Sequence, residues 1–352
     1  MKKSNLLFYV AFLAIFLSSC SDDEPDPIEP KGDYENGYFV TNEGPFQNGS
    51  GTISFVEDGG SVSQNVYKQV NNEDLGNIVN SMHIADDKGY IVVNNSNKVV
   101  VVNRFTMEKE DVILGDDIVN PRFFVAGGGK GFISNWGDPL NTEDDFITVI
   151  SLSNNQVLTT IPVGEGPEKM LLDGGRLYVC LQGGYGSNNK VVVINTEDNS
   201  IIENLIVGDI PNSILYDRNS DIWVLCQGKP AYTGDETNGS LFKIQAGSNE
   251  LTSIEFTSVQ HPSLLNYEEE NLYYNLDGKV YRFGINDTEL PTEALTGLNG
   301  FYYAMNIDSG ELYATDAGDY ASEGTLKVFN LVSGDLMQTI STGIVPGQIV
   351  FP

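Results

Sequence analysis

Residues 166–179 read GPEKMLLDGGRLYV, and this phrase decides the fold because it returns along the chain. It returns as IPNSILYDRNSDIWV at residues 210–224 and as HPSLLNYEEENLYY at residues 261–274. Each copy joins a proline, a short apolar run, a polar turn and a second apolar run with an aromatic residue. Short apolar runs that are bounded by Gly, Asn and Asp predict β-strands joined by tight turns.

Weaker copies extend the pattern over almost the whole chain. The seven copies are marked at positions 80, 121, 167, 211, 262, 300 and 346, which are the proline positions in the three strong copies. A complete unit holds four strand-like runs, at residues 169–172, 176–181, 190–195 and 201–207. A period of about 44 residues with four strands per unit is typical of a β-propeller.

The two chain ends complement each other. The last copy leaves room for one strand, at residues 348–351, and the N-terminal part supplies three, at residues 38–41, 52–56 and 65–70. Pairing of the two ends would close a circular array and cover its edges. We therefore predict an all-β, seven-bladed β-propeller over residues 37–352, closed by N-terminal strands that pair with the C-terminal strand. An open β-solenoid and two β-sandwiches are the alternatives.

The N-terminus has the features of a lipoprotein signal. Lys2 and Lys3 precede an apolar run at residues 6–17, which is too short to span a bilayer, and the segment LSSC ends at Cys20. This pattern resembles a bacterial lipobox, which implies removal of residues 1–19 and lipidation of Cys20. Residues 21–24 read SDDE, which resembles the surface-export signal of Bacteroidetes lipoproteins. We expect a lipidated acidic linker at residues 20–36, an outer-membrane anchor and display at the cell surface.

The charge of the chain excludes one class of partner. The 352 residues contain 19 Lys and Arg against 49 Asp and Glu, so the net charge is −30, and removal of residues 1–19 leaves 17 − 49 = −32. Nucleic-acid binding needs a basic stripe, and this chain has none. We expect no nucleic-acid partner.

The predicted loops differ between the two faces of the ring. The first and second strands of each blade are joined by short polar turns, whereas most second-to-third connections are long. Each long connection holds an aromatic residue, and such residues among Gly, Asn and Gln are typical of binding surfaces. We expect ligand contacts from Phe46, Trp136, Tyr185, Tyr232 and Tyr320.

A second set of candidates lies where the second strand of each blade ends. Its members are Asn42, Asn94, Asn135, Gln182, Gln227, Asn275 and Asp316. Seven amides or carboxylates at one register would surround a central funnel and bind a polar ligand. Alternatively, each side chain caps its own loop. Arg122, in the connection between two blades, would add a charged contact.

Catalytic and metal-binding motifs are missing from the sequence. No HExxH, nucleophile elbow or phosphate-binding loop followed by a helix occurs, and only two histidines are present. A calcium ion in the central funnel is conceivable, since oxygen ligands are available. We expect no catalytic residue, no metal site, no cofactor and no enzyme activity. Cys180 and Cys226 lie at neighbouring strand ends, as a disulfide or as two buried thiols.

Several phrases resemble one family. They are GYFVTNEG at 37–44, LGN at 75–77, YIVVNN at 90–95, NPR at 120–122 and VGEGPE at 163–168. The chain resembles the YncE-like surface propeller lipoproteins of Bacteroidetes, including the BtuG cobalamin-capturing group. The resemblance covers nearly all of residues 37–352. It implies a surface protein that captures cobalamin or a related corrinoid and passes it to a TonB-dependent outer-membrane transporter.

Two other functions stay open at this point. One is a surface propeller that binds another nutrient or a glycan, or that serves as a protein-interaction scaffold. The other is a calcium-dependent hydrolase of the lactonase kind. A corrinoid is a broad disc with amide arms, and aromatic loops around polar amides would suit such a ligand. Its overall neutrality also suits a strongly acidic receptor.

Overall fold

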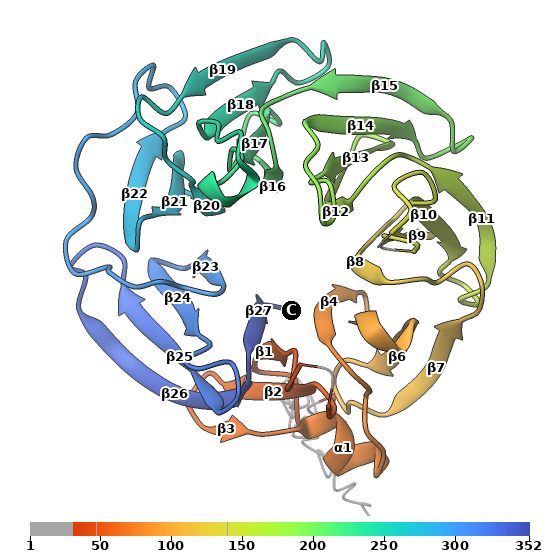
Figure 1. The fold of residues 1–352 in the computed structure, drawn as a ribbon. Coiled ribbons are helices and arrows are strands. Elements are labelled where there is room, and N and C mark those ends of the chain that lie inside the picture. Colours follow the sequence, from red (N-terminus) through yellow and green to blue (C-terminus); the bar gives the residue numbers. More distant parts are fainter. Residues whose placement is uncertain (1–30, 47, 139) are drawn as a thin grey trace, which may run out of the picture. The chain divides into compact units, whose positions relative to one another are not determined.

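The computed structural model describes residues 31–352 except 47 and 139. Seven antiparallel sheets surround a central axis, which confirms the predicted seven-bladed propeller (Figure 1).

We number the blades along the chain and give their strands from the axis outward. Blade 1 contains β4 (Val79–Ala85), β5 (Lys88–Val93), β6 (Lys98–Asn103) and β7 (Lys109–Leu114); blade 2 contains β8 (Pro121–Gly127), β9 (Lys130–Asn135), β10 (Phe146–Ser151) and β11 (Val157–Pro162). Blade 3 contains β12 (Pro167–Asp173), β13 (Arg176–Leu181), β14 (Lys190–Asn195) and β15 (Ile201–Ile206); blade 4 contains β16 (Pro211–Tyr216), β17 (Ile222–Cys226), β18 (Ser240–Ile244) and β19 (Leu251–Glu255).

The last three blades differ more from one another. Blade 5 contains β20 (Ser263–Glu268), β21 (Asn271–Leu276) and β22 (Lys279–Gly284); blade 6 contains β23 (Met305–Asp308), β24 (Glu311–Asp316), β25 (Glu323–Asn330) and β26 (Leu336–Ile344). Blade 7 joins both chain ends, with β27 (Pro346–Val350) innermost, followed by β1 (Gly37–Asn42), β2 (Thr52–Glu57) and β3 (Val62–Ser63). In this blade Val40 pairs with Ile349, so the C-terminal strand closes the ring against the N-terminal strand.

Apolar side chains on both faces of each sheet hold the blades together. The seven buried clusters each lie between two consecutive blades. In β6, Val99 and Val101 pack toward blade 2, while Val100 and Val102 pack toward blade 7. A blade strand is therefore buried on both faces, and its sequence is a continuous apolar run.

Two predicted strands are replaced by other structure. Residues 65–70 were expected to form the outer strand of blade 7, but β3 occupies that place and α1 (Val66–Asn71) follows it. The helix buries Val66 and Tyr67 against the cluster between blades 7 and 1, which a strand would not do for two adjacent side chains. Blade 5 has no fourth strand among the described residues. There Leu295 donates a backbone hydrogen bond to Val280, so an irregular segment covers the edge of β22.

The folded part of the described chain begins before residue 37. The Tyr34 backbone N–H donates to the Phe105 carbonyl at 2.9 Å, and the Tyr34 ring lies edge-on to Phe55 with 5.2 Å between ring centroids. The linker that was expected to reach residue 36 therefore ends earlier, because a buried aromatic residue fixes it to the propeller. The signal, Cys20 and the acidic segment that follows lie outside the described residues.

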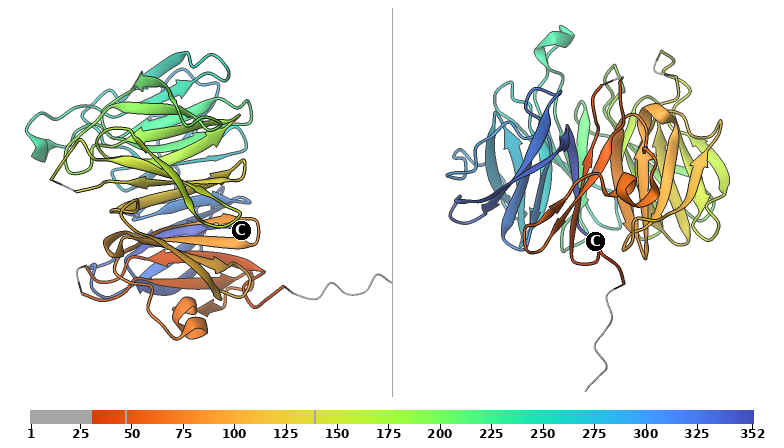
Figure 2. Two further views of the ribbon diagram at one scale, coloured as in Figure 1. Left: turned by 90° about the vertical axis from the view of Figure 1, so that its right-hand side faces the viewer. Right: turned by 90° about the horizontal axis from the view of Figure 1, so that it is seen from below.

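The two faces of the propeller carry different connections. We call the end with the first-to-second strand turns the turn face, and the opposite end the loop face. The η2 segment (Ala231–Thr233) and the β9–β10 connection project from the same loop face (Figure 2). At the turn face, Lys31 lies 3.6 Å from Asp87 in the β4–β5 turn. The chain therefore enters the propeller on the face opposite the long loops.

Candidate functional site

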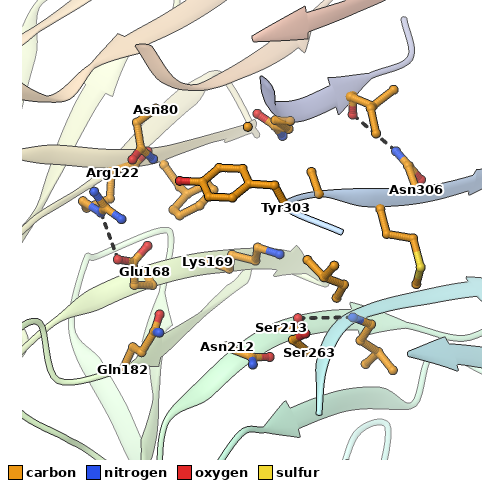
Figure 3. A pocket seen from close by; sticks show the side chains of 18 of the residues that line it. Asn80, Arg122, Glu168, Lys169, Gln182, Asn212, Ser213, Ser263, Tyr303 and Asn306 are labelled. Atoms are coloured by element: carbon orange, nitrogen blue, oxygen red, sulfur yellow. Dashed lines mark hydrogen bonds and ion pairs between the residues drawn. The ribbon is translucent and has the colours of Figure 1, made fainter. Parts of the chain in front are cut away.

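A polar cavity of about 480 Å³ opens at the loop-face end of the central axis (Figure 3). All seven blades contribute to its wall. Its lining residues include Glu43, Asn80, Arg122, Trp136, Glu168, Lys169, Gln182, Asn212, Ser213, Ser263, Asn266, Tyr303, Asn306 and Gln348. A concave site with several converging polar groups is the usual form of a small-molecule binding site.

Irregular pairing at the start of the inner strands positions this wall. The register of the inner strand shifts near its start in blades 1 to 5, for example between Pro167 and Met170 in blade 3. A bulge leaves residues out of the regular ladder and redirects their side chains. In these five blades the cavity is lined by residues inside the shift: Asn80, Arg122, Glu168, Asn212 and Leu264. The repeated proline phrase is thus the sequence signal for the cavity wall.

Side chains of the wall link most neighbouring blades in a belt. Asn80 donates to the Arg122 carbonyl at 2.6 Å, and Asn212 donates to the Pro262 carbonyl at 3.1 Å. The remaining links are Arg122 to Glu168, Asn266 to Met305, Asn306 to Ile349, and Met82 to Gln348. Among the described residues, only the junction of blades 3 and 4 has no such side-chain link from the cavity wall.

A cation stacked on an aromatic ring occupies one side of the cavity. The Arg122 guanidinium carbon lies 4.2 Å from the centroid of the Trp136 ring, and Arg122 Nε donates to Glu168 Oε1 at 2.9 Å. The side chain of Glu168 is only 5% exposed. Burial raises the pKa of Glu168, and the charge of Arg122 opposes that rise. Arg122 is thus fixed by two neighbours, so its side chain is a rigid part of the wall.

The opposite side of the cavity holds an aromatic pair. The Tyr303 hydroxyl donates to Glu43 Oε1 at 2.7 Å, and Tyr320 lies edge-on to Tyr303 with 5.8 Å between ring centroids. Burial raises the pKa of Glu43, whereas the hydrogen bond from Tyr303 lowers it. Tyr320 is exposed, so this pair connects the loop surface to the cavity wall.

Lys169 is the least constrained charged group of the wall. It lies in β12 beside Glu168, and it forms no ion pair or side-chain hydrogen bond with any described residue. Burial lowers the pKa of Lys169, while the carboxylate of Glu168 raises it. Nearby, Asn212 Oδ1 and Trp136 Nε1 are shielded from solvent and have no partner among the described residues.

The predicted aromatic residues lie on the loop face in different settings. Phe46, Tyr185, Tyr232 and Tyr320 are exposed, while Trp136 is half-buried and lines the cavity. Tyr185 lies edge-on to Trp136 with 5.8 Å between ring centroids, so these two form one surface. Tyr232, on η2, makes no aromatic contact with another described residue. Phe301, next to the β21–β22 turn, is 87% exposed and was not among the aromatic residues predicted from the sequence.

The predicted polar ring divides in two. Five of its members bond to nearby protein groups: Asn42 to Thr52, Asn94 to Pro121, Asn135 to Thr148, Asn275 to Gly300, and Asp316 to Lys327. These side chains brace their own loops or the next crossover. Gln182 lines the cavity, and Gln227 is half-buried with its backbone carbonyl against His261. The structure therefore brings Gln182, Arg122 and Trp136 together, and leaves the five bonded side chains outside the cavity wall.

Several groups of the wall were not predicted as site residues. Asn80, Ser263, Tyr303 and Gln348 lie on inner strands or directly before them. The repeated phrase predicts that these strands lie at the axis, but the direction in which each side chain points depends on the bulges.

Other potential sites are less developed in the described part of the chain. No group of three or more His, Cys, Asp or Glu residues there is arranged to hold a metal ion. Among the same residues, no helix is long and apolar enough to cross a bilayer. Cys180 and Cys226 are free, buried thiols, and burial raises the pKa of Cys226 to about 12.

A family model described as a domain of unknown function, DUF5074, matches residues 36–351. The chain belongs to the DUF5074 family. No curated protein sequence matches the chain significantly. Among solved structures, this DUF5074 protein is similar to a functionally unknown protein from Desulfotomaculum acetoxidans, with a TM-score of 0.64 and 14% identity over 90% of this chain and 98% of the other.

Two further solved structures have the same TM-score. A hypothetical selenium-binding protein from Sulfolobus tokodaii is 12% identical and covers 89% of this chain and 92% of its own. A periplasmic gluconolactonase from Pseudomonas aeruginosa is 11% identical and covers 89% of this chain and 98% of its own. At these identities the similarity shows a shared propeller fold for the DUF5074 chain, and function must be argued from its own site.

Proposed function

We propose that this DUF5074 protein is a cell-surface lipoprotein that captures cobalamin, or a related corrinoid, and delivers it to a TonB-dependent outer-membrane transporter. The observation that carries the proposal is the loop-face cavity, which is walled by amides, hydroxyls and aromatic rings from all seven blades. A corrinoid presents a broad ring with amide arms around its rim. Amides that still have a free polar atom, such as Asn212, can pair with such arms.

The aromatic residues around the cavity support a broad ligand. Tyr185 with Trp136 and Tyr320 with Tyr303 extend from the exposed loop surface to opposite sides of the wall. Tyrosine and tryptophan offer large contact areas with few rotatable bonds, so little conformational entropy is lost on binding. The cavity of about 480 Å³ would take only a part of a corrinoid. The rest would lie against the exposed loops.

The charge of the protein supports an overall neutral ligand. A receptor with a net charge of −32 after signal removal repels polyanions over distances of about one Debye length, roughly 8 Å at physiological salt. In this proposal the protein binds its ligand and does not catalyse a reaction. The cavity carboxylates Glu168 and Glu43 are held by Arg122 and Tyr303, which favours a structural role for both.

The entry point of the chain supports delivery from the surface. Lys31 follows Cys20 by eleven positions, and a fully extended segment of that length spans at most about 40 Å. Because Lys31 lies at the turn face, a tether from Cys20 would join the propeller at the face opposite the cavity. A protein held in this way would present the cavity outward to arriving ligand and would need to reorient on the transporter.

The experiment is a calorimetric titration of the full-length protein in detergent with cyanocobalamin. We expect one binding event per protein, and we expect Ser263→Trp to abolish it because the indole would fill the cavity. Ser333→Trp is the matched control, since Ser333 is exposed in the β25–β26 turn, outside the cavity. If the wild type releases no heat and shows no binding in equilibrium dialysis, the corrinoid proposal is wrong.

The anchor and the transporter need separate tests. Cys20→Ala should move the protein out of the outer-membrane fraction, and protease added to intact cells should degrade only the anchored wild type. Copurification after crosslinking should recover a TonB-dependent transporter with the wild type. Retention of Cys20→Ala in the outer membrane would contradict the anchor.

A further inference from the structure

The junction of blades 3 and 4 is the incomplete part of the belt around the cavity. Every other junction is crossed by a hydrogen bond or an ion pair from a wall side chain. At this junction the wall instead presents Lys169 from blade 3 and Asn212 Oδ1 from blade 4, neither of which has a partner among the described residues. Polar groups left without partners in a cavity are available to a ligand.

The charges around Lys169 distinguish it from the other cation of the wall. The Arg122 side chain is engaged by Glu168 and Trp136, so its charge is already compensated. Lys169 points into the cavity, as Figure 3 shows, and Glu168 beside it is directed to Arg122. Among the described residues, Lys169 is thus a cavity ammonium group without an ion-pair or hydrogen-bond partner, in a protein whose net charge is strongly negative.

We propose that Lys169 binds an anionic group of the ligand, specifically a phosphodiester carried by an otherwise neutral molecule. An ammonium group pairs with phosphate oxygens through short, charge-assisted hydrogen bonds. Asn212 would complete the contact by accepting a hydrogen bond from a neighbouring amide or hydroxyl of the ligand. This inference rests on the proposed function, because cobalamin carries one phosphodiester between its corrin ring and its lower nucleotide.

A pair of corrinoids tests this assignment. Cyanocobalamin contains the phosphodiester, whereas dicyanocobinamide has the same amide-bearing ring without the phosphodiester and the nucleotide. With the full-length protein in detergent, calorimetry should show that Lys169→Gln weakens cyanocobalamin binding by about 10- to 100-fold. The same substitution should leave dicyanocobinamide binding within about twofold.

The control is Lys279→Gln, which removes an equal charge from an exposed position at the start of β22, outside the cavity. It should change neither affinity. Lys169→Met provides a second variant, and thermal unfolding of all three variants should show midpoints close to that of the wild type. If Lys169→Gln weakens both corrinoids equally, or neither, the role of Lys169 is wrong while the proposed function stands. If neither corrinoid binds the wild type, both the proposed function and the role of Lys169 are wrong.

Discussion

Arg122 lies over the ring of Trp136, with its guanidinium carbon 4.2 Å from the ring centroid, and the same group pairs with the buried Glu168. The three residues come from two blades, so their contact both shapes the cavity and joins blade 2 to blade 3. Removal of Arg122 would leave a buried carboxylate without its partner.

Arg122→Ala should therefore lower the free energy of unfolding by about 3 kcal/mol. The double variant Arg122→Ala with Glu168→Gln should recover part of this loss, because the remaining side chain is neutral. Urea denaturation of the two variants and the wild type measures the effect. Equal losses in both variants would show that the unpaired charge is not the cause.

Gly166 allows the approach of two loops on the loop face. Its φ is +71°, and a Cβ atom there would lie 2.0 Å from the Gly184 backbone nitrogen, within the loop that carries Tyr185. Gly166→Ala should cost more than about 3 kcal/mol of unfolding free energy. Gly174→Ala is the control, since Gly174 also has a positive φ but an open surrounding, and it should cost only about 1 kcal/mol. Similar losses in both variants would contradict the role of the close contact.

Asp145 gives a predicted pH dependence. Burial raises its pKa to about 6, and the carboxylates of Asp144 and Glu165 add to this, while the N–H of Gly166 opposes it. The folded state therefore binds a proton at a higher pH than the unfolded state does. The unfolding free energy should rise as the pH falls through about 6 toward the unfolded pKa.

Asp145→Asn should remove this contribution, because an amide does not titrate. Urea denaturation at about pH 7 and about pH 4.5 should show a smaller gain on acidification in the variant than in the wild type. The comparison between the two proteins cancels the general effect of the negative net charge. An identical pH dependence would contradict the raised pKa of Asp145.

Tyr185 tests the loop surface separately from the cavity. It is 80% exposed, so Tyr185→Ala should leave the thermal midpoint unchanged and weaken cyanocobalamin binding by about 5- to 30-fold. Tyr216→Ala is the control, because Tyr216 is also exposed but ends β16 at the turn face. Equal affinities for both variants would exclude Tyr185 from the ligand surface.

The repeat could be predicted from the sequence because each blade strand is buried on both faces. Runs such as the four valines of β6 are compatible with few structures other than a buried strand. Prolines mark the start of five of the seven inner strands, at the first residue or directly before it. Two departures had no such signal. Residues 65–70 read NVYKQV, a stretch too short for its apolar pattern to separate a strand from a helical turn, and only the neighbouring blade decides that Val66 and Tyr67 are buried together. Blade 5 loses its outer strand to an irregular segment that hydrogen-bonds to Val280 of β22.

The candidate site was only partly predictable. The long loops and their aromatic residues follow from the positions of the strands, and four of the five aromatics are exposed. The polar ring was harder to predict, because side-chain amides at the strand ends serve two purposes. Asn135 bonds to Thr148 within its own blade, whereas Gln182 faces the cavity, and both occupy strand ends of the same kind. Register shifts in the inner strands direct Arg122 and Asn212 to the cavity. The prolines mark where these shifts begin, but the residue pattern does not show which side chain they turn inward.

A crystal structure of the full-length protein with cyanocobalamin would test the central claim most directly. The claim is that the loop-face cavity is the binding site of a corrinoid receptor. We predict density for the corrin ring over the cavity mouth, between Trp136 and Tyr303, with the phosphodiester at Lys169. A corrinoid bound at the turn face, or an empty cavity under saturating ligand, would contradict it.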